Sequence, residues 1–347
     1  MRRSCNQNRH HRDLPTTSTM ASPQPIICVL GSLNIDLVYY IPHHPLAGET
    51  LTAIESNVFP GGKGANQAVA CAKLSRTRTL QDSSVTVKMI GAVGPDAHGT
   101  TLMDSLQSYG VDVSEVVRTE GDSAHALTGS AIVMVEKESG QNRIIISPGA
   151  NASLRPSRFA EKFNPRPALL VMQLEVPMDT VLQALRTAKA TNTPVLLNPA
   201  PAAELPEEAY IGLAHLILNE TEIALLAQVT ETELEDMSKV EKATADILAK
   251  GVQNIVVTLG ARGAYYACHD GRSGVVRGLK VDVVDTTAAG DTFIGRYSIL
   301  AVEAASRSET FDVEAAVRSS IVASSITVSR SGAQVSIPWK DELESAR

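Results

Sequence analysis

Short apolar runs recur along the chain and alternate with longer segments in which apolar residues have helical spacing. From residue 169 on, the runs are Leu169 to Met172, Val195 to Leu197, Leu216 to Leu218 and Ile255 to Val257. Two more, Ile26 to Leu30 and Val85 to Val93, come earlier. Short apolar runs bounded by turn residues are typical of buried strands. Strands that alternate with helices predict an α/β fold with a parallel sheet.

Two other stretches have a different pattern. Leu37 to Phe59 consists of short mixed runs separated by turn residues, without helical periodicity. Ala126 to Val135 and Asn142 to Ser147 are strand-like, and the turn between them, Glu136 to Gln141, contains a glycine. This spacing predicts a hairpin. Because no helix is available to cover it, we expect the hairpin to join Leu37 to Phe59 in a small separate sheet.

Polar residues follow four of the predicted parallel strands at the point where each strand ends. They are Gln173 and Glu175, Asn198, Asn219 to Glu222, and Thr258 with the glycine-bearing segment up to Gly263. Turn and cap chemistry explains any one of them as well as function does. Ligands of parallel sheets bind outside the carboxyl ends of the strands, so their shared edge predicts an active site. Asn219 and Glu222 could orient magnesium-bound water and phosphate there.

The stretch Val281 to Gly295 carries the strongest candidate chemistry. Its β-branched run, Val281 to Val284, predicts the end of a strand, and an apolar helix follows from Phe293. Between them, Ala288 to Gly290 have almost no side chain and leave the first N–H groups of the helix open to an anion. Asp291 suits a base that deprotonates a hydroxyl beside that anion. The alternative is a plain helix cap, and this stretch alone leaves both interpretations open.

A second glycine-rich stretch runs from Gly61 to Gln67. Its spacing predicts a helix that places Lys63 and Asn66 on one face, near glycines that let a ligand approach the backbone. The stretch is neither a dinucleotide fingerprint nor a Walker A loop, because the required third glycine and Gly-Lys-Ser/Thr are missing. Asn34 and Asp36, just past the first strand, share a face if extended and could grip sugar hydroxyls. In isolation, both pairs also suit ordinary turns.

Composition narrows the class of protein. The 347 residues suffice for one large α/β domain or two small ones, and the net charge of −7 gives no electrostatic reason to expect nucleic-acid binding. No apolar run approaches the roughly 20 residues of a membrane span. The four cysteines, Cys5, Cys28, Cys71 and Cys268, are far apart and are predicted to be reduced thiols. We expect a cytoplasmic location, with the nucleus as a second one. Residues 1–25 are basic and acid-poor, as in a mitochondrial targeting segment, but their polar composition favours a disordered leader.

The two glycine-bearing stretches resemble the signatures of one family. Gly-Gly-Lys-Gly-Ala-Asn at 61–66 and Asp-Thr-Thr-Ala-Ala-Gly-Asp at 285–291 are similar to the N- and C-terminal signatures of the ribokinase-like (pfkB) carbohydrate kinases. Intermediate blocks, such as Asn-Pro-Ala-Pro-Ala at 198–202, extend the resemblance from Ile26 to Trp339. It implies a three-layer α/β/α fold with a mostly parallel central sheet. It also implies one kinase domain, 26–340, with lid strands from about 35–59 and 122–147. The implied activity is ATP-dependent phosphorylation of D-ribose at its 5-hydroxyl.

The resemblance also implies roles for individual residues. Ribose would be held by Asn34, Asp36, Gly62, Lys63, Asn66, Glu175 and Asp291, with Asp291 as the catalytic base. The amides of Ala288, Ala289 and Gly290 would form an anion hole. ATP would meet Asn219, Thr258, Gly260, Gly263, Gly290 and Ile321, and Glu222 would lie near the water shell of Mg²⁺. An activating K⁺ would be held by Asp285, Thr287, Thr327, Arg330, Gly332 and Ser336. The family resemblance further implies a homodimer formed through the lid.

Four residues depart from the family pattern. Val335 stands where proline is common, Ile321 stands where a polar residue near the nucleotide is common, and Ile294 and Arg296 replace small or polar residues. A charged Arg296 in a buried helix needs a partner. None of these departures removes a catalytic group. Two alternatives remain at this point: a kinase for another sugar or a nucleoside, and a sugar sensor that does not catalyse.

Overall fold

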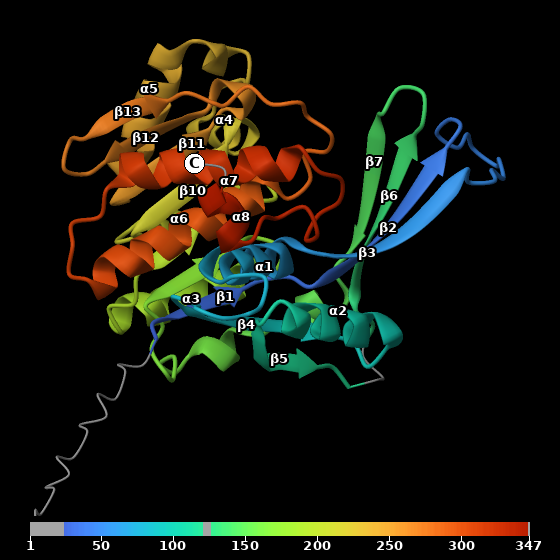
Figure 1. Cartoon of the computed structure of the whole chain (residues 1–347), viewed down its shortest axis with the longest axis horizontal. Helices are drawn as coiled ribbons and strands as arrows, with labels where there is room; N and C mark the ends of the chain where they lie inside the picture. The colour runs from blue at the N-terminus through green and yellow to red at the C-terminus, as the bar shows by residue number, and fades with distance from the viewer. Residues whose placement is uncertain (1–23, 121–125, 346–347) are drawn as a thin grey trace, which may run out of the picture.

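A nine-stranded sheet forms the centre of the computed structural model, which describes residues 24–120 and 126–345 (Figure 1). The strand order is β13-β12-β11-β10-β9-β8-β1-β4-β5. The strands are β1 (Ile26–Leu30), β4 (Thr86–Val93), β5 (Asp112–Arg118), β8 (Leu169–Met172), β9 (Val195–Leu197), β10 (His215–Asn219), β11 (Asn254–Thr258), β12 (Ala264–Cys268) and β13 (Ser273–Val276). All neighbours pair in parallel except β11 with β12 and β12 with β13. The predicted mostly parallel sheet is therefore confirmed.

Helices cover both faces of this sheet and make three layers. The helices are α1 (Lys63–Ser75), α2 (Ala97–Ser108), α3 (Met178–Ala190), α4 (Glu220–Ala227), α5 (Met237–Leu248), α6 (Ala289–Ser306), α7 (Val313–Val328) and α8 (Lys340–Ser345). Successive side chains of a strand point to opposite faces. Accordingly, Ile27 and Val29 pack in one core with α1, α2, α6, α7 and α8, whereas Cys28 and Leu30 pack in the other core with α3, α4 and α5.

A second sheet stands away from this body as a lid (Figure 1). Its order is β3-β2-β6-β7, formed by β2 (Asn34–Ile41), β3 (Glu55–Gly61), β6 (Gly129–Glu136) and β7 (Asn142–Ser147). The small separate sheet predicted from the two non-helical stretches is therefore present. At its base, Asn34 of β2 pairs with Gly61 of β3 and with Gly129 of β6. Residues 122–125 of the predicted lid, and the predicted leader except its last two residues, lie outside the described residues.

The strand predicted at Val281 to Val284 is wrong. The segment has no regular secondary structure, bends at Val284 and belongs to neither sheet. It leaves the large sheet after the edge strand β13 and passes the end of α7, where the Val284 N–H donates to the Val328 carbonyl at 2.8 Å. β-branched residues favour an extended backbone, but a strand also needs a neighbouring strand to pair with. The side chains of Val283 and Val284 are 62% and 63% exposed.

In residues 24–120 and 126–345, no helix is both long and apolar enough to cross a membrane. The three cysteines in these ranges, Cys28, Cys71 and Cys268, are buried free thiols.

Candidate active site

Asp291 lies in the first turn of α6, where two side chains of α1 meet it. Asn66 donates to Asp291 Oδ2 at 3.2 Å and Gln67 donates to Asp291 Oδ1 at 3.0 Å. The two helices can approach because α6 has a glycine at 295. A Cβ added there would stand 2.5 Å from the Cβ of Ala70 in α1. The close crossing of α1 and α6 thus brings both amide side chains to the carboxylate.

The environment of Asp291 affects its charge in two directions. Burial raises the pKa of its carboxyl, while the Lys63 charge and the hydrogen bonds from Gln67 and Asn66 lower it; the net shift is upward. A carboxylate with a raised pKa is a stronger base for a hydroxyl proton than an exposed one.

The backbone before Asp291 turns sharply. Ala288, the N-cap of α6, has a left-handed conformation with φ of 60°. This conformation is uncommon for a residue with a side chain. It starts the helix abruptly, so that Ala288, Ala289, Gly290 and Asp291 all line one cavity of about 220 Å³. The Ala289 N–H donates to Thr286 O through a long bond of 3.3 Å. A stronger acceptor placed in this cavity would compete for that donor.

Besides Asp291, five of the seven predicted sugar-binding residues carry a polar side chain. They are Asn34, Asp36, Lys63, Asn66 and Glu175, and they gather between the lid base and α1. Glu175 Oε2 accepts from the Ser32 hydroxyl at 2.5 Å and from the Lys63 N–H at 2.9 Å. Asn34 Oδ1 accepts from Asn151 Nδ2 at 2.8 Å. Asn34, Asn151 and Glu175 line a cavity of about 320 Å³.

Gly62 connects the lid to α1 in a conformation that other residues rarely adopt. Its φ is 89°, and a Cβ there would lie 2.7 Å from the Asn34 backbone nitrogen. Glycine is therefore required for the packing of α1 against β2. This position fixes Lys63 beside Glu175.

Asp36 has a strongly perturbed carboxyl on the sugar side of the site. Its pKa is raised to about 7, first by burial and then by repulsion from Glu175 and Asp291, while Lys63 acts in the opposite direction. Three carboxyls sharing one lysine indicate a site built to meet several hydroxyl donors.

The predicted nucleotide residues line two adjoining cavities. Asn219, Glu222 and Thr258 line the cavity of about 220 Å³ that contains Asp291. Thr258 also lines a neighbouring cavity of about 510 Å³, together with Gly260, Gly263, Val281, Val283 and Ile321. The two cavities share Thr258, Thr286, Ala289 and Gly290 as walls. The apolar Ile321 and the exposed valines give the larger cavity a hydrophobic side, which suits an aromatic base.

A buried polar chain connects Asp291 with Glu222. Gln67 donates to Asn198 Oδ1 at 3.2 Å as well as to Asp291, and Asn198 Nδ2 donates to Glu222 Oε2 at 3.4 Å. Glu222 also forms a capping box with Asn219, with both bonds at 2.9 Å. Burial raises the pKa of the Glu222 carboxyl. Asn198 was predicted only as one of the polar residues at the strand ends, and Gln67 was assigned no contact, although it directly follows the Gly-Gly-Lys-Gly-Ala-Asn motif.

The predicted cation-binding segments, 285–287 and 327–336, lie side by side. Asp285 Oδ2 accepts from the Gly332 N–H at 2.9 Å, and Asp285 Oδ1 accepts from the Thr287 N–H at 2.9 Å. Burial opposes ionisation of Asp285, but these bonds outweigh it and lower its pKa. A charged carboxylate and turn carbonyls fit the oxygen preference of K⁺.

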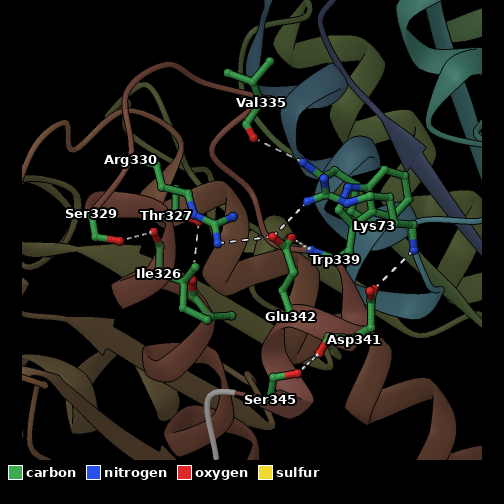
Figure 2. A network of polar contacts seen from close by, with 12 residues as sticks. Lys73, Ile326, Thr327, Ser329, Arg330, Val335, Trp339, Asp341, Glu342 and Ser345 are labelled. Atoms are coloured by element: carbon green, nitrogen blue, oxygen red, sulfur yellow. Dashed lines mark hydrogen bonds and ion pairs between the residues drawn. The ribbon is translucent and has the colours of Figure 1, made fainter.

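The other predicted cation-site residues use their side chains elsewhere. The Thr327 hydroxyl lies 2.9 Å from that of Thr292, and Ser336 donates to Ala333 O at 2.7 Å. The Arg330 guanidinium reaches Glu342 of α8 at 3.3 Å (Figure 2). Because their side chains have these partners, only the backbone carbonyls of these residues are left to bind the predicted cation.

The residues that depart from the family pattern fit into the fold without disturbing the site. Arg296 donates to the Ser319 hydroxyl at 2.9 Å, Ile294 is a buried wall of the 220 Å³ cavity, and Val335 is 64% exposed. None of them enters the group of polar residues around Asp291.

The fold and this site define a sugar kinase of one family. Residues 24–340 match the model of the "pfkB family carbohydrate kinase", so the chain belongs to that family. A ribokinase of Schizosaccharomyces pombe is 39% identical to it over 325 residues, which are 92% of this chain and 96% of the relative. A deoxyribokinase of Salmonella typhi is 34% identical over 90% of this chain and 95% of its own length. The structure of Arabidopsis thaliana ribokinase complexed with ribose and ATP is similar, with a TM-score of 0.81 and 28% identity over 93% of this chain and 99% of that one.

Proposed function

We propose that this chain transfers the γ-phosphoryl group of ATP to the 5-hydroxyl of D-ribose. The observation that carries the proposal is the place of Asp291. Its carboxylate is bonded to Asn66 on the sugar side and lines the same cavity as Ala288 to Gly290. One carboxylate therefore stands between a group of polar residues suited to hydroxyls and the open start of a helix suited to phosphate. The ribokinases related to the chain over most of its length support the same activity.

In the proposed reaction, Asp291 accepts the proton of the 5-hydroxyl. The oxygen then forms a bond to the γ-phosphorus, and the bond from that phosphorus to the bridging oxygen of ADP breaks. The amides of Ala288, Ala289 and Gly290 stabilise the charge on the transferred group, and Lys63 adds a positive charge beside it. In phosphoryl transfer, this kind of positioning and charge stabilisation supplies most of the catalysis.

Two kinds of metal ion are part of the proposal. Glu222 and Asn219 would orient the water shell of a Mg²⁺, which would neutralise phosphate charge, since Mg²⁺ keeps much of its water when bound. Asp285, Thr287, Thr327, Arg330, Gly332 and Ser336 would hold K⁺, the last five through backbone carbonyls. A cation held there would fix the segment just before Ala288 and so keep the following amides pointed at the phosphate.

We also propose that the chain forms a homodimer through its lid. The edge strand β7 exposes three consecutive isoleucines, Ile144, Ile145 and Ile146, at 55%, 56% and 50%. An exposed apolar edge strand favours association. Light scattering after size-exclusion chromatography should give a dimer mass, and Ile145→Lys should give a monomer mass. A monomeric wild-type protein at micromolar concentration would contradict the proposal.

A cytoplasmic location is proposed on the basis of the thiols. Cys28, Cys71 and Cys268 are buried and unpaired, as is usual for proteins of reducing compartments. Fluorescence microscopy of the full chain fused at its C-terminus tests this; an organellar pattern would contradict it.

The central test is an assay of ADP release with ribose, 2-deoxyribose, fructose and adenosine. We expect ribose to have the highest kcat/KM, because a site that hydrogen-bonds a substrate hydroxyl discriminates against an analogue without it. The deoxyribokinase relative makes 2-deoxyribose the sharpest comparison. A higher kcat/KM for 2-deoxyribose, fructose or adenosine than for ribose would show that ribose is not the preferred substrate. Absence of ADP release with every acceptor, while the sugars still bind, would favour a sensor.

A further inference from the structure

Lys73 has an unusual environment at the end of α1. Its side chain is 2% exposed, and its ammonium donates to the carbonyls of Gln334 at 3.1 Å and Val335 at 3.4 Å. The same ammonium lies 5.3 Å from the ring centres of both Tyr109 and Trp339. Within the part of the chain that the structure describes, no carboxylate stands within 4.0 Å of it.

A buried lysine without a carboxylate partner is costly unless its charge is used. Burial lowers the pKa of the Lys73 ammonium to about 8, so the group remains charged at neutral pH. Two aromatic faces and two carbonyls supply the stabilisation that water would otherwise give. The geometry is that of a fixed internal cation bound to the 330–336 loop. Figure 2 shows Lys73 reaching toward Val335, within a network that also contains Trp339, Glu342 and Arg330.

The loop that Lys73 holds is connected to the site by side-chain contacts. Gln334, whose carbonyl accepts from Lys73, uses its side-chain amide to donate to Asn66 Oδ1 at 3.1 Å. Asn66 in turn donates to Asp291 Oδ2 at 3.2 Å. The other end of the Gln334 amide accepts from the Ser105 hydroxyl at 3.2 Å, which fixes the orientation of the side chain.

Helix α1 therefore contacts the site twice. Near its start it supplies Lys63, Asn66 and Gln67, and about 15 Å further along the helix Lys73 holds the loop that returns to Asn66. The loop also contains Arg330, Gly332 and Ser336 of the proposed K⁺ site.

We propose that Lys73 is a positioning residue, whose ammonium fixes the 330–336 loop and thereby orients both the proposed K⁺ site and, through Gln334 and Asn66, the carboxylate of Asp291. This inference rests on the proposed phosphoryl transfer. Lys73 and K⁺ both order the same loop, so the loss of one should weaken binding of the other.

The test compares Lys73→Met with Lys73→Arg. Methionine keeps an apolar chain of similar length against the two rings but removes the charge, whereas arginine keeps the charge. Lys88→Met is the matched control, because Lys88 is also largely covered, with 16% of its side chain exposed, but its partner is Asp112 at 3.4 Å. All variants are assayed at fixed ionic strength with K⁺ varied against tetramethylammonium.

For Lys73→Met we expect kcat to fall about tenfold, with a change of less than about threefold in the sugar KM. The K⁺ concentration for half-maximal activation should rise about five- to tenfold. Lys73→Arg should recover most of the loss, and Lys88→Met should match the wild type. A Lys73→Met protein that melts earlier but keeps wild-type kcat and K⁺ dependence would show that Lys73 serves packing only and would overturn the proposal.

Hydrogen exchange gives a readout that needs neither activity nor K⁺. Peptides that cover 330–336 should exchange about tenfold faster in Lys73→Met than in the wild type or Lys73→Arg. Unchanged exchange there would overturn the proposal even if the chain turned out to phosphorylate no sugar. If Lys73→Met does not fold, Gln334→Met tests the same route, because it keeps the backbone carbonyl that Lys73 binds and removes the side-chain amide that contacts Asn66 and Ser105. Wild-type kcat in Gln334→Met would exclude that route.

Discussion

The side-chain amide of Gln67 bonds to Asp291 Oδ1 at 3.0 Å and to Asn198 Oδ1 at 3.2 Å. Gln67 is fully buried, and its carbonyl oxygen accepts from Gln173. Its amide is therefore fully used, and a rotation that improved one bond would weaken another. This arrangement fixes the carboxylate of Asp291 relative to the strand ends that carry the predicted magnesium residues.

Gln67→Met tests the importance of that arrangement. The variant keeps the side-chain volume but leaves Gln173, Asn198 and Asp291 each without one bond. We expect kcat to fall about tenfold and the free energy of unfolding to fall by about 1–3 kcal/mol, the cost of leaving buried polar groups unsatisfied. Steady-state kinetics and urea unfolding measure the two effects. An unchanged kcat in a destabilised protein would limit Gln67 to a structural role.

Asp291→Asn tests the proposed base. We expect kcat to fall at least about 10²-fold, the low end of the contribution of general acid–base catalysis. Sugar binding, measured by calorimetry, should persist because asparagine still hydrogen-bonds a hydroxyl. Asp282→Asn is the matched control, since Asp282 is an exposed aspartate of the same segment. Near-wild-type turnover in a folded Asp291→Asn protein would rule out the base.

Replacement of the monovalent cation tests the second metal site. We expect turnover in K⁺ to exceed that in Na⁺ or tetramethylammonium at equal ionic strength by at least about fivefold. Asp285→Asn should lose most of this difference, because the charge that joins Thr287 to Gly332 is removed. Equal rates in all three salts would leave Asp285 as a residue that only joins two turns.

The raised pKa of Asp36 should make the free energy of unfolding depend on pH in a particular direction. Its pKa is about 7 in the folded protein against an ordinary value of 3.8, with Glu175, Asp291 and Lys63 as its charged neighbours. Between these two values the unfolded chain releases a proton that the folded protein keeps. The carboxyl therefore contributes nothing below about pH 4, destabilises increasingly as the pH rises, and has its full effect above about pH 7.

Asp36→Asn removes this titration. The gain in Tm over the wild type should be larger at pH 8 than at pH 5, by about 2–4 °C. Differential scanning calorimetry at the two pH values measures it. A gain that is the same at both values would show that the Asp36 carboxyl keeps an ordinary pKa in the folded protein.

Apolar runs predicted much of the fold from the sequence because burial leaves a direct mark on composition. The strands at Leu169–Met172, Val195–Leu197 and Asn142–Ser147 have the predicted bounds. The error at Val281 to Val284 has the opposite cause, because composition records a preference for extended backbone but not whether a partner strand is present. The antiparallel edge formed by β12 and β13 was not predicted. β12 is the short run Ala-Tyr-Tyr-Ala-Cys, β13 is the four residues Ser-Gly-Val-Val, and the described residues between β11 and β12 contain no α-helix to continue the strand–helix alternation.

In the candidate site, too, some residues could be predicted from local sequence and others could not. Asp291, Lys63 and Asn66 stand in glycine-bearing stretches that have their own sequence signal, and the structure brings these three residues together. Gln67, Asn198 and Gln334 act through contacts between residues more than 100 positions apart. Such contacts depend on how helices cross, and no local pattern records that crossing.

The base of the lid, where Asn34 pairs with both Gly61 and Gly129, has a mechanical consequence. The eight residues of β2 reach about 26 Å from that base at roughly 3.3 Å per residue. A rotation of the lid about its base, where the sugar-side residue Asn34 lies, therefore displaces the far end of the lid much more than the base. A rotation of about 10° at Asn34 would carry the far end of β2 about 4–5 Å over that length. A fluorophore at the hairpin tip near Gly140 would therefore report rotations at the base of the lid that produce only small displacements at the site itself.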